Sequence, residues 1–476
     1  MLYSNTFSIF LTRFFPNLAN VLVWIFFSRT LTPDVNGAYQ NFWIHTYMIY
    51  PLACLGLHQL LLTYKPETLT HFFNLLKPRH FTSYLAWLAG MGIVFHYIQF
   101  SEHPVNITLS FFLMVIFPLS VILESFLIVA GQFKALIAAN ILYSVAYLGV
   151  HYYFFSSPLN LSLIFGGIAV IGTIRLFAYL FAAQKALTTY KIESKSRVED
   201  IAISKVKTLW VHMSVYDTIQ TYSTYVDKFI VSLLLPSATS AIYFTGTQNI
   251  PFLSIILSAA SGATMMQLKG EKDKPEHALF TIKASARAQG AVVFPILCFL
   301  LFSRHEIFWF LSGESNKYAA SIPIFVASLM MLPFKAYSYT TILQKYHKGN
   351  IINAGAIIEL SLSIALMYPF YKIWGLPGLA LSFVAATIVQ VAIYLHFTSK
   401  LLKVNIFMLL PFANWIVKVI IFGALFFVTD HVLRPLCGPL ILFSVQTVLL
   451  IVSIAVSLFT EFKLLNRHGI AHAKQN

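Results

Sequence analysis

Apolar stretches of membrane-spanning length recur from one end of this chain to the other. A helix needs about 20 mostly apolar residues to cross a bilayer, and only helices and closed barrels satisfy the polypeptide backbone within lipid. The sequence therefore predicts an all-α polytopic membrane protein. The predicted spans are about fourteen in number, near residues 5–28, 38–62, 81–100, 108–130, 135–155, 162–184, 209–235, 241–266, 288–308, 321–343, 351–371, 376–398, 408–429 and 439–460.

The seventh predicted span differs from the others because it carries a polar stripe. Four of its residues recur at the spacing i, i+4, i+7 and i+11 and so share one helix face: Asp217, Thr221, Thr224 and Lys228. Asp227 lies beside this stripe. Ionisable groups at membrane depth are costly and rarely face lipid. The stripe therefore favours a span that looks into a wet or protein-lined interior, as in a transport cavity.

The first predicted span carries a second stripe at the same spacing, formed by Arg13, Asn17, Asn20 and Trp24. When the sequence is shifted by 204 residues, FFSRTLTPDVNGAY falls on IVSLLLPSATSAIY, and Arg13 falls on Asp217. The two stripes therefore occupy equivalent places, which indicates a parallel internal repeat.

The repeat predicts four regions along the chain. Two six-helix bundles, residues 1–184 and 209–398, enclose a central cavity and are joined by a basic cytoplasmic linker, residues 185–208. Residues 399–476 form two extra transmembrane helices and a cytoplasmic tail.

The formal net charge of +15 reflects the orientation of the protein in the membrane and does not indicate a nucleic-acid partner. Most of the 32 lysine and arginine residues fall in links on one side of the predicted spans, including the linker. Lysine and arginine are enriched in cytoplasmic loops, so both termini are expected in the cytoplasm.

The sequence contains no recognisable motif for an enzyme or a cofactor. A GxxxxGK[ST] phosphate loop is absent, and the 15 histidines and 3 cysteines form no HExxH or Cys/His cluster. The links on the predicted outer side are short, without the soluble face expected of a membrane glycosyltransferase or polymerase. We therefore expect a non-enzyme without metal or cofactor, with its histidines at the membrane interface.

Three stretches resemble a known transporter family. They are FFSRTLTPDVNGAYQ after the first span, VDKFIVSLLLPSATSAIYF around the seventh and KIWGLPGLALSFVAATIV at the start of the twelfth. Together they resemble the polysaccharide-exporter branch of the multidrug/oligosaccharidyl-lipid/polysaccharide (MOP) transporter superfamily, which includes the O-antigen flippases.

The resemblance implies a multi-pass protein of the bacterial cytoplasmic (inner) membrane. It implies that an undecaprenyl-diphosphate-linked oligosaccharide moves from the inner to the outer leaflet by alternating access. The expected partners are this lipid-linked substrate, membrane lipids, H⁺ or Na⁺, and other polysaccharide-assembly proteins.

The resemblance also implies that cations in the cavity meet the diphosphate or acidic sugars. The matching candidates are Arg13 and Lys228, followed by Arg175 and Lys335. For Arg13 the alternative is snorkelling to the cytoplasmic interface, and for Lys228 it is an ion pair with another helix. Hydroxyl and amide groups suit sugars, and the two stripes offer Asn17, Asn20, Thr221 and Thr224.

Four carboxylates within the predicted spans are candidates for ion coupling or for salt bridges: Asp217, Asp227, Glu124 and Glu359. Asp217 and Asp227 either bind a coupling ion or pair with Arg13 or Arg175. Asp227 is expected to be a poor partner for Lys228, because successive residues on a helix point about 100° apart.

Glu124 and Glu359 are expected to join helices or to form a gate. Lys335 is a candidate partner for Glu359. Lys418, in the thirteenth span, has no evident role beyond a groove for the lipid tail.

Two other functions stay open at this stage. One is a MATE-like H⁺- or Na⁺-coupled multidrug antiporter, and the less favoured one is a membrane glycosyltransferase or polymerase. The predicted spans hold more cations than carboxylates, which suits an anionic cargo better than a cationic drug. The five cations are Arg13, Arg175, Lys228, Lys335 and Lys418.

Overall fold

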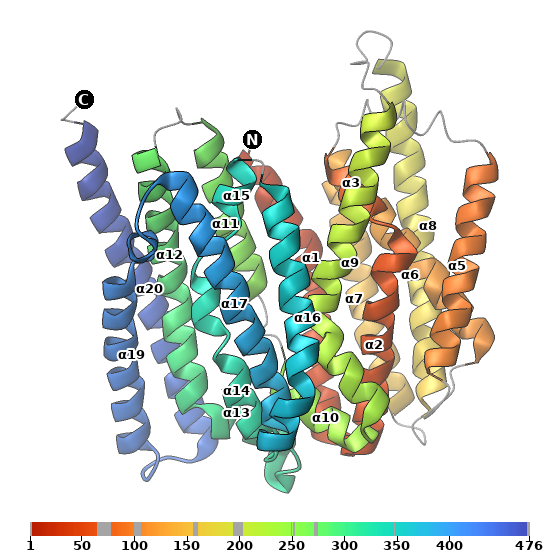
Figure 1. Cartoon of the computed structure of the whole chain (residues 1–476). Helices are drawn as coiled ribbons and strands as arrows, with labels where there is room; N and C mark the ends of the chain where they lie inside the picture. Colours follow the sequence, from red (N-terminus) through yellow and green to blue (C-terminus); the bar gives the residue numbers. More distant parts are fainter. Residues whose placement is uncertain are drawn as a thin grey trace. The chain divides into compact units, whose positions relative to one another are not determined.

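The structure is a computed structural model that describes residues 2–63, 78–99, 106–155, 160–193, 203–248, 250, 253–270, 275–346 and 348–473. Throughout these residues the regular structure is helical, with no strand (Figure 1). The chain divides into two compact units, Met1–Ala241 and Ile242–Asn476. The middle of the predicted linker, residues 194–202, lies outside the described residues.

The first unit is built from long helices with short connections. They are α1 (Leu2–Thr30), α2 (Pro33–Cys54), α3 (Leu57–Thr63), α5 (Pro78–Ile98), α6 (Ile107–Val129), α7 (Phe133–Phe155), α8 (Leu161–Glu193) and α9 (Ile203–Leu234), and α10 (Ser237–Gly246) continues into the second unit.

The second unit combines long helices with short helical pieces. The long helices are α11 (Leu253–Gly270), α12 (Pro275–Phe302), α16 (Gly349–Trp374), α17 (Leu376–Leu402), α19 (Phe412–Leu433) and α20 (Pro439–Ala473). The short pieces are α13 (Arg304–Ser312), the 3₁₀ turn η1 (Gly313–Ser315), α14 (Ser321–Leu329), the 3₁₀ turn η2 (Leu332–Ala336), α15 (Thr341–Lys345) and α18 (Ile406–Leu409).

Ten of the described helices are long and apolar enough to cross a membrane: α1, α5, α6, α7, α8, α12, α16, α17, α19 and α20. The other four predicted spans coincide with α2–α3, α9, α10–α11 and α14–α15. The predicted fold class, an all-α polytopic protein with about 14 membrane segments, is thus confirmed.

The second predicted span, residues 38–62, is broken rather than continuous. Helix α2 ends at Cys54 and α3 begins at Leu57, because Leu55 and Gly56 both adopt a left-handed backbone with φ of 50° and 64°. A side chain at Gly56 would lie within 2.5 Å of the α9 backbone at Ser214. This corner is therefore too close to α9 for any residue larger than glycine.

Two spans of the second unit are broken as well, contrary to the prediction of continuous helices over 241–266 and 321–343. Helix α10 ends at Gly246 and α11 begins at Leu253, while α14 passes through η2 into an extended Tyr337. Pro333 lies in the first turn of η2, where it has no N–H to continue an α-helical ladder. Non-helical backbone at membrane depth is tolerated only where protein or water covers it.

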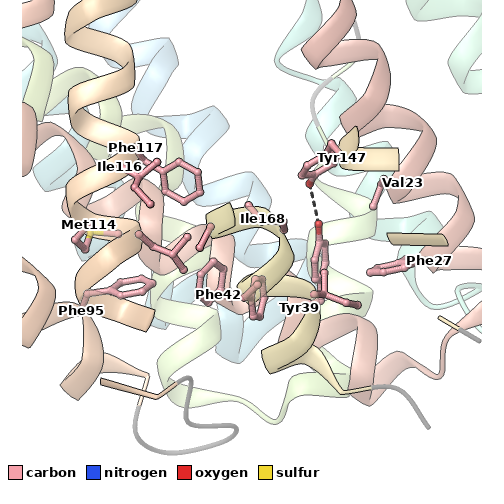
Figure 2. Close-up of a cluster of buried hydrophobic side chains, with 14 of the residues drawn as sticks. Val23, Phe27, Tyr39, Phe42, Phe95, Met114, Ile116, Phe117, Tyr147 and Ile168 are labelled. Atoms are coloured by element: carbon pink, nitrogen blue, oxygen red, sulfur yellow. Dashed lines mark hydrogen bonds between the residues drawn. The ribbon is translucent and has the colours of Figure 1, made fainter. Parts of the chain in front are cut away.

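Aromatic side chains from α2 lie at the centre of the first unit. The Phe42 ring stacks on Phe165 of α8 at 3.6 Å and meets Phe95 of α5 edge-on at 5.3 Å. Figure 2 shows Tyr39 pointing toward Tyr147 of α7, and their hydroxyls are 2.9 Å apart. These contacts fix α2 against three neighbours, and each aromatic pair adds about 0.5–1.5 kcal/mol beyond its buried area.

Helix α12 is the most deeply buried of the ten apolar helices in the described structure, because 67% of its most apolar stretch is buried. Lys418 of α19 joins it to α20, because its Nζ lies 2.9 Å from the Arg287 carbonyl and 2.9 Å from Glu461. The lysine has a structural partner in α20, so the lipid-tail groove predicted for it is not needed to explain its position.

Candidate functional site

Arg13 on α1 and Glu124 on α6 form an open ion pair in the first unit. The Arg13 Nε lies 4.0 Å from Oε1 of Glu124, and the two side chains are 53% and 20% exposed. Ion pairs this exposed contribute about 0–1 kcal/mol. The guanidinium is therefore held only loosely and is available to a second anion.

Arg175 on α8 is a second cation near the same carboxylate. Its guanidinium carbon lies 3.9 Å from the centre of the Tyr143 ring on α7. Its Nε is buried and has no hydrogen-bond partner among the described residues. Arg13, Glu124 and Arg175, which we call the arginine cluster, therefore carry one positive charge in excess.

Asn140 on α7 positions both arginine-bearing helices. Its amide nitrogen donates to the Thr12 carbonyl on α1 at 2.8 Å, one residue before Arg13. Its amide oxygen accepts a hydrogen bond from the Tyr179 hydroxyl on α8 at 2.6 Å, one turn after Arg175. Asn140 is buried, so it holds α1 and α8 at a fixed separation around Glu124.

Asn140 is not among the residues predicted for the site, although the sequence carries a signal for it. Helix α7 buries a polar stripe with the spacing i, i+4, i+7 and i+11, namely Asn140, Ser144, Tyr147 and His151. This is the same spacing that identified the stripes of α1 and α9.

Asn17 and Asn20 lie with Arg13 on the exposed face of α1. The Asn17 amide nitrogen donates to the Arg13 carbonyl at 2.8 Å. The structure thus places two further predicted binding residues, Asn17 and Asn20, on the same helix face as Arg13 of the arginine cluster.

Lys228 and Asp227 on α9 pair with each other. The Lys228 Nζ lies 3.8 Å from Oδ2 of Asp227, and both side chains are 10% exposed. The prediction that Asp227 is a poor partner was wrong, because the long lysine side chain bends back to its neighbour's carboxylate. Arg13 and Lys228 are therefore held in different ion pairs, while Thr221 and Thr224 are partly buried on α9.

Asp217 pairs with a histidine rather than with Arg13 or Arg175, which corrects the predicted salt bridge. Its Oδ1 lies 3.4 Å from Nε2 of His58 on α3, and both side chains are nearly buried. The pair lies next to the break between α2 and α3. The other side-chain atoms of this pair, Asp217 Oδ2 and His58 Nδ1, are buried without a hydrogen-bond partner among the described residues.

Among the described residues of the first unit, three histidines are buried, although histidines were expected at the membrane interface. His45 lies 2.9 Å from the Ser232 hydroxyl, and His151 lies 2.9 Å from the Tyr39 hydroxyl. Together with His58, they form polar contacts between helices. The expectation failed because one ring nitrogen of each of these histidines finds a hydroxyl or carboxylate partner inside the bundle.

In the second unit, Glu359 of α16 accepts hydrogen bonds from Thr387 and Gln390 of α17, each at 2.6 Å. It therefore joins two helices, as expected, but through neutral donors rather than through Lys335. Lys335 lies exposed in η2, within a broken span.

The described helices, with charged groups inside the first unit and broken spans in both units, define a polytopic helical membrane protein with a charged interior. No family model matches the chain, and no curated protein matches it.

Solved structures, in contrast, match over most of the chain. The chain is similar to the lipid II flippase MurJ in an inward closed conformation, with a TM-score of 0.62, 14% identity and coverage of 95% of this chain and 98% of that chain. It is also similar to an inward-facing multidrug resistance MATE family transporter of the MOP superfamily, with a TM-score of 0.57, 11% identity and coverage of 82% and 94%.

A third similar structure is a MOP superfamily transporter from Pyrococcus furiosus, for which a binding pocket of reversed polarity suggests a different function. The TM-score is 0.51 at 10% identity, over 88% of this chain and 95% of that chain. The chain therefore has the fold of MOP superfamily transporters. The polysaccharide-exporter branch stays a prediction.

Proposed function

We propose that this protein is a flippase that moves a polyprenyl-diphosphate-linked oligosaccharide across a bacterial cytoplasmic membrane by alternating access. The observation that carries the proposal is the arginine cluster, in which Arg13 pairs with Glu124 and Arg175 is a second cation near the same carboxylate. A net positive charge within a membrane-spanning bundle is energetically unfavourable unless an anion neutralises it. A diphosphate is such an anion.

The chemistry of the cluster fits a lipid diphosphate. Charge-assisted hydrogen bonds from arginine replace the hydration that a phosphate loses inside a protein. The adjacent amides of Asn17 and Asn20 suit sugar hydroxyls. The polyprenyl tail needs no polar partner and would stay in lipid.

The fold supports the same proposal, because one of the similar structures is named as a lipid II flippase. The similar structures are transporters, which agrees with a non-enzymatic role. Two six-helix bundles around a cavity, substrate contacts by Lys228 and Lys335, and cytoplasmic termini belong to the proposal as its further parts.

A second candidate is an H⁺- or Na⁺-coupled multidrug antiporter. The buried pair of Asp217 and His58 favours it, because its unsatisfied side-chain atoms offer a place for a proton. The arginine cluster disfavours it, because excess positive charge repels cationic drugs.

The test is flipping of a fluorescent undecaprenyl-diphosphate-linked disaccharide in proteoliposomes, read out with a membrane-impermeant quencher. We expect Arg13→Gln and Arg175→Gln each to slow flipping by about tenfold or more, since hydrogen bonds to charged groups contribute about 1.5–3 kcal/mol. Arg29→Gln, at the end of the same α1 helix, is the control and should flip at the wild-type rate. Wild-type flipping in both cluster variants, or ethidium efflux driven by a pH gradient without flipping, would reject the proposal.

A further inference from the structure

A cavity of about 650 Å³ opens in the second unit between α13, the η1 turn, α14, and the junction of α19 and α20. Its position corresponds to links that the charge distribution predicts on the outer side of the membrane. Ligand pockets of small molecules typically enclose about 300–1,000 Å³, so this cavity has room for a sugar unit. The lining residues that matter here are His305, Glu306, Trp309, Asn316, Ile322 and Arg434.

One wall of the cavity is a fixed network of charged and polar groups. Arg434 donates to both oxygens of Asp430, at 2.8 and 3.2 Å, and its Nη2 lies 2.9 Å from Glu306. Gln446 of α20 donates to the same aspartate at 3.3 Å and accepts from the Ser303 hydroxyl at 2.6 Å. The polar groups are therefore held in place by α19, α20 and α13 before any ligand arrives.

The cation of this wall is a poor partner for a phosphate. Both Glu306 and Asp430 already pair with the guanidinium of Arg434. The Glu306 Oε2 is buried and has no hydrogen-bond partner among the described residues. This acceptor calls for a donor, which a ligand hydroxyl, directly or through one water, would supply.

The remaining walls suit the apolar faces of a sugar ring. Trp309 and Ile322 line the cavity together with Ala319 and Pro439. Asn316 adds an amide from a turn in which it adopts a left-handed backbone, with φ of 47°. An aromatic ring beside carboxylate, guanidinium and amide groups offers both dispersion contacts to C–H groups and partners for hydroxyls.

We infer that this cavity is a saccharide-binding site for neutral or amino sugars. The inference deepens the proposed function, on which it rests for naming the ligand as the glycan half of the cargo. The excess positive charge of the arginine cluster suits a diphosphate, whereas this cavity, whose guanidinium is already paired, suits uncharged sugar hydroxyls.

The test is saturation-transfer NMR on the purified full-length protein in nanodiscs, with N-acetylglucosamine, galactose and glucuronate as probes. We expect saturation transfer to the two neutral sugars and weaker transfer to glucuronate. Trp309→Ala should reduce the transfer by about tenfold, as loss of a buried aromatic anchor does. Asn316→Ala is a second, milder variant of the same wall, and should also reduce it.

Trp374→Ala is the matched control, because Trp374 is an exposed tryptophan on α16 of the same unit. Equal transfer in the Trp309→Ala and Trp374→Ala variants, or preferred binding of glucuronate, would overturn the inference. The proposed function is tested separately by Arg13→Gln, which should keep the sugar signal while it loses flipping. Sugar binding without flipping in the wild type would reject only the proposed function, and flipping without sugar binding would reject only this inference.

Discussion

Replacing Glu124 by glutamine tests whether the arginine cluster is an anion site. The substitution keeps the size and most of the hydrogen-bonding capacity of the side chain but removes its charge. If Glu124 competes with the cargo for Arg13 and Arg175, its removal should tighten the binding of a diphosphate. It should also slow flipping, because tighter binding of the diphosphate in the resting conformation does not stabilise the transition state through which the cargo is moved.

The magnitude follows from the geometry of the pair. Two unit charges 4.0 Å apart, the distance between Arg13 Nε and Glu124 Oε1, interact by about 4 kcal/mol at an effective dielectric constant of about 20. The Arg13 side chain is 53% exposed, so water reduces the net effect to about 1 kcal/mol or less. Since about 1.4 kcal/mol corresponds to a tenfold change, we expect the diphosphate to bind several-fold more tightly.

The assay is calorimetric titration of the protein in nanodiscs with farnesyl diphosphate, a short-chain soluble analogue, together with flipping in proteoliposomes. Glu359→Gln is the matched control, because that carboxylate is bound by the neutral donors Thr387 and Gln390. Weaker farnesyl diphosphate binding in Glu124→Gln, or the same change in both variants, would refute the competition between Glu124 and the cargo.

Three further outcomes are expected for stability, each measured by thermal unfolding in detergent with Asn20→Leu on the exposed face of α1 as a neutral control. Asn140→Leu should lose about 1–3 kcal/mol for each buried group left unsatisfied, and an unchanged melting temperature would contradict its bridging role. Lys418→Met should lose about 3–5 kcal/mol by leaving the buried Glu461 carboxylate without its cation and with only the neutral Asn414 amide as donor, and the added Glu461→Leu should restore most of it. Gly56→Ala should destabilise the first unit, because its Cβ would lie within 2.5 Å of the α9 backbone, whereas Gly149→Ala, which meets no atom within 4 Å, should not.

The number and order of the membrane segments could be predicted from the sequence, because apolar length alone decides whether a helix can span a bilayer. The breaks within three of them could not. Leu55 is an ordinary helix-forming residue, yet it adopts a left-handed backbone, and the Trp210 indole donates to its carbonyl at 2.6 Å. That conformation depends on the packing of α2 and α3 against α9, which local sequence does not encode.

The charged members of the candidate site could also be found from the sequence. Arg13, Glu124 and Arg175 stand out because ionisable residues are rare and costly within spans. Their partners could not be found, because pairing depends on which helices are neighbours. Asp217 pairs with His58 across 159 positions of the chain only because α3 packs against α9.

The polar stripes of the spans explain why part of the site was misread. A stripe on a membrane helix needs either water or a polar partner, and the structure gives the stripe of α9 a partner in α3, where His58 meets Asp217. The stripe of α1 is different, because Arg13, Asn17 and Asn20 are exposed and Asn140 of α7 binds only the neighbouring Thr12 carbonyl. The stripe of α9 alone therefore does not require a wet cavity. What is left after this pairing is the half-exposed guanidinium of Arg13 beside an excess positive charge, and a polar group that the protein leaves incompletely satisfied is the one that a cargo can use.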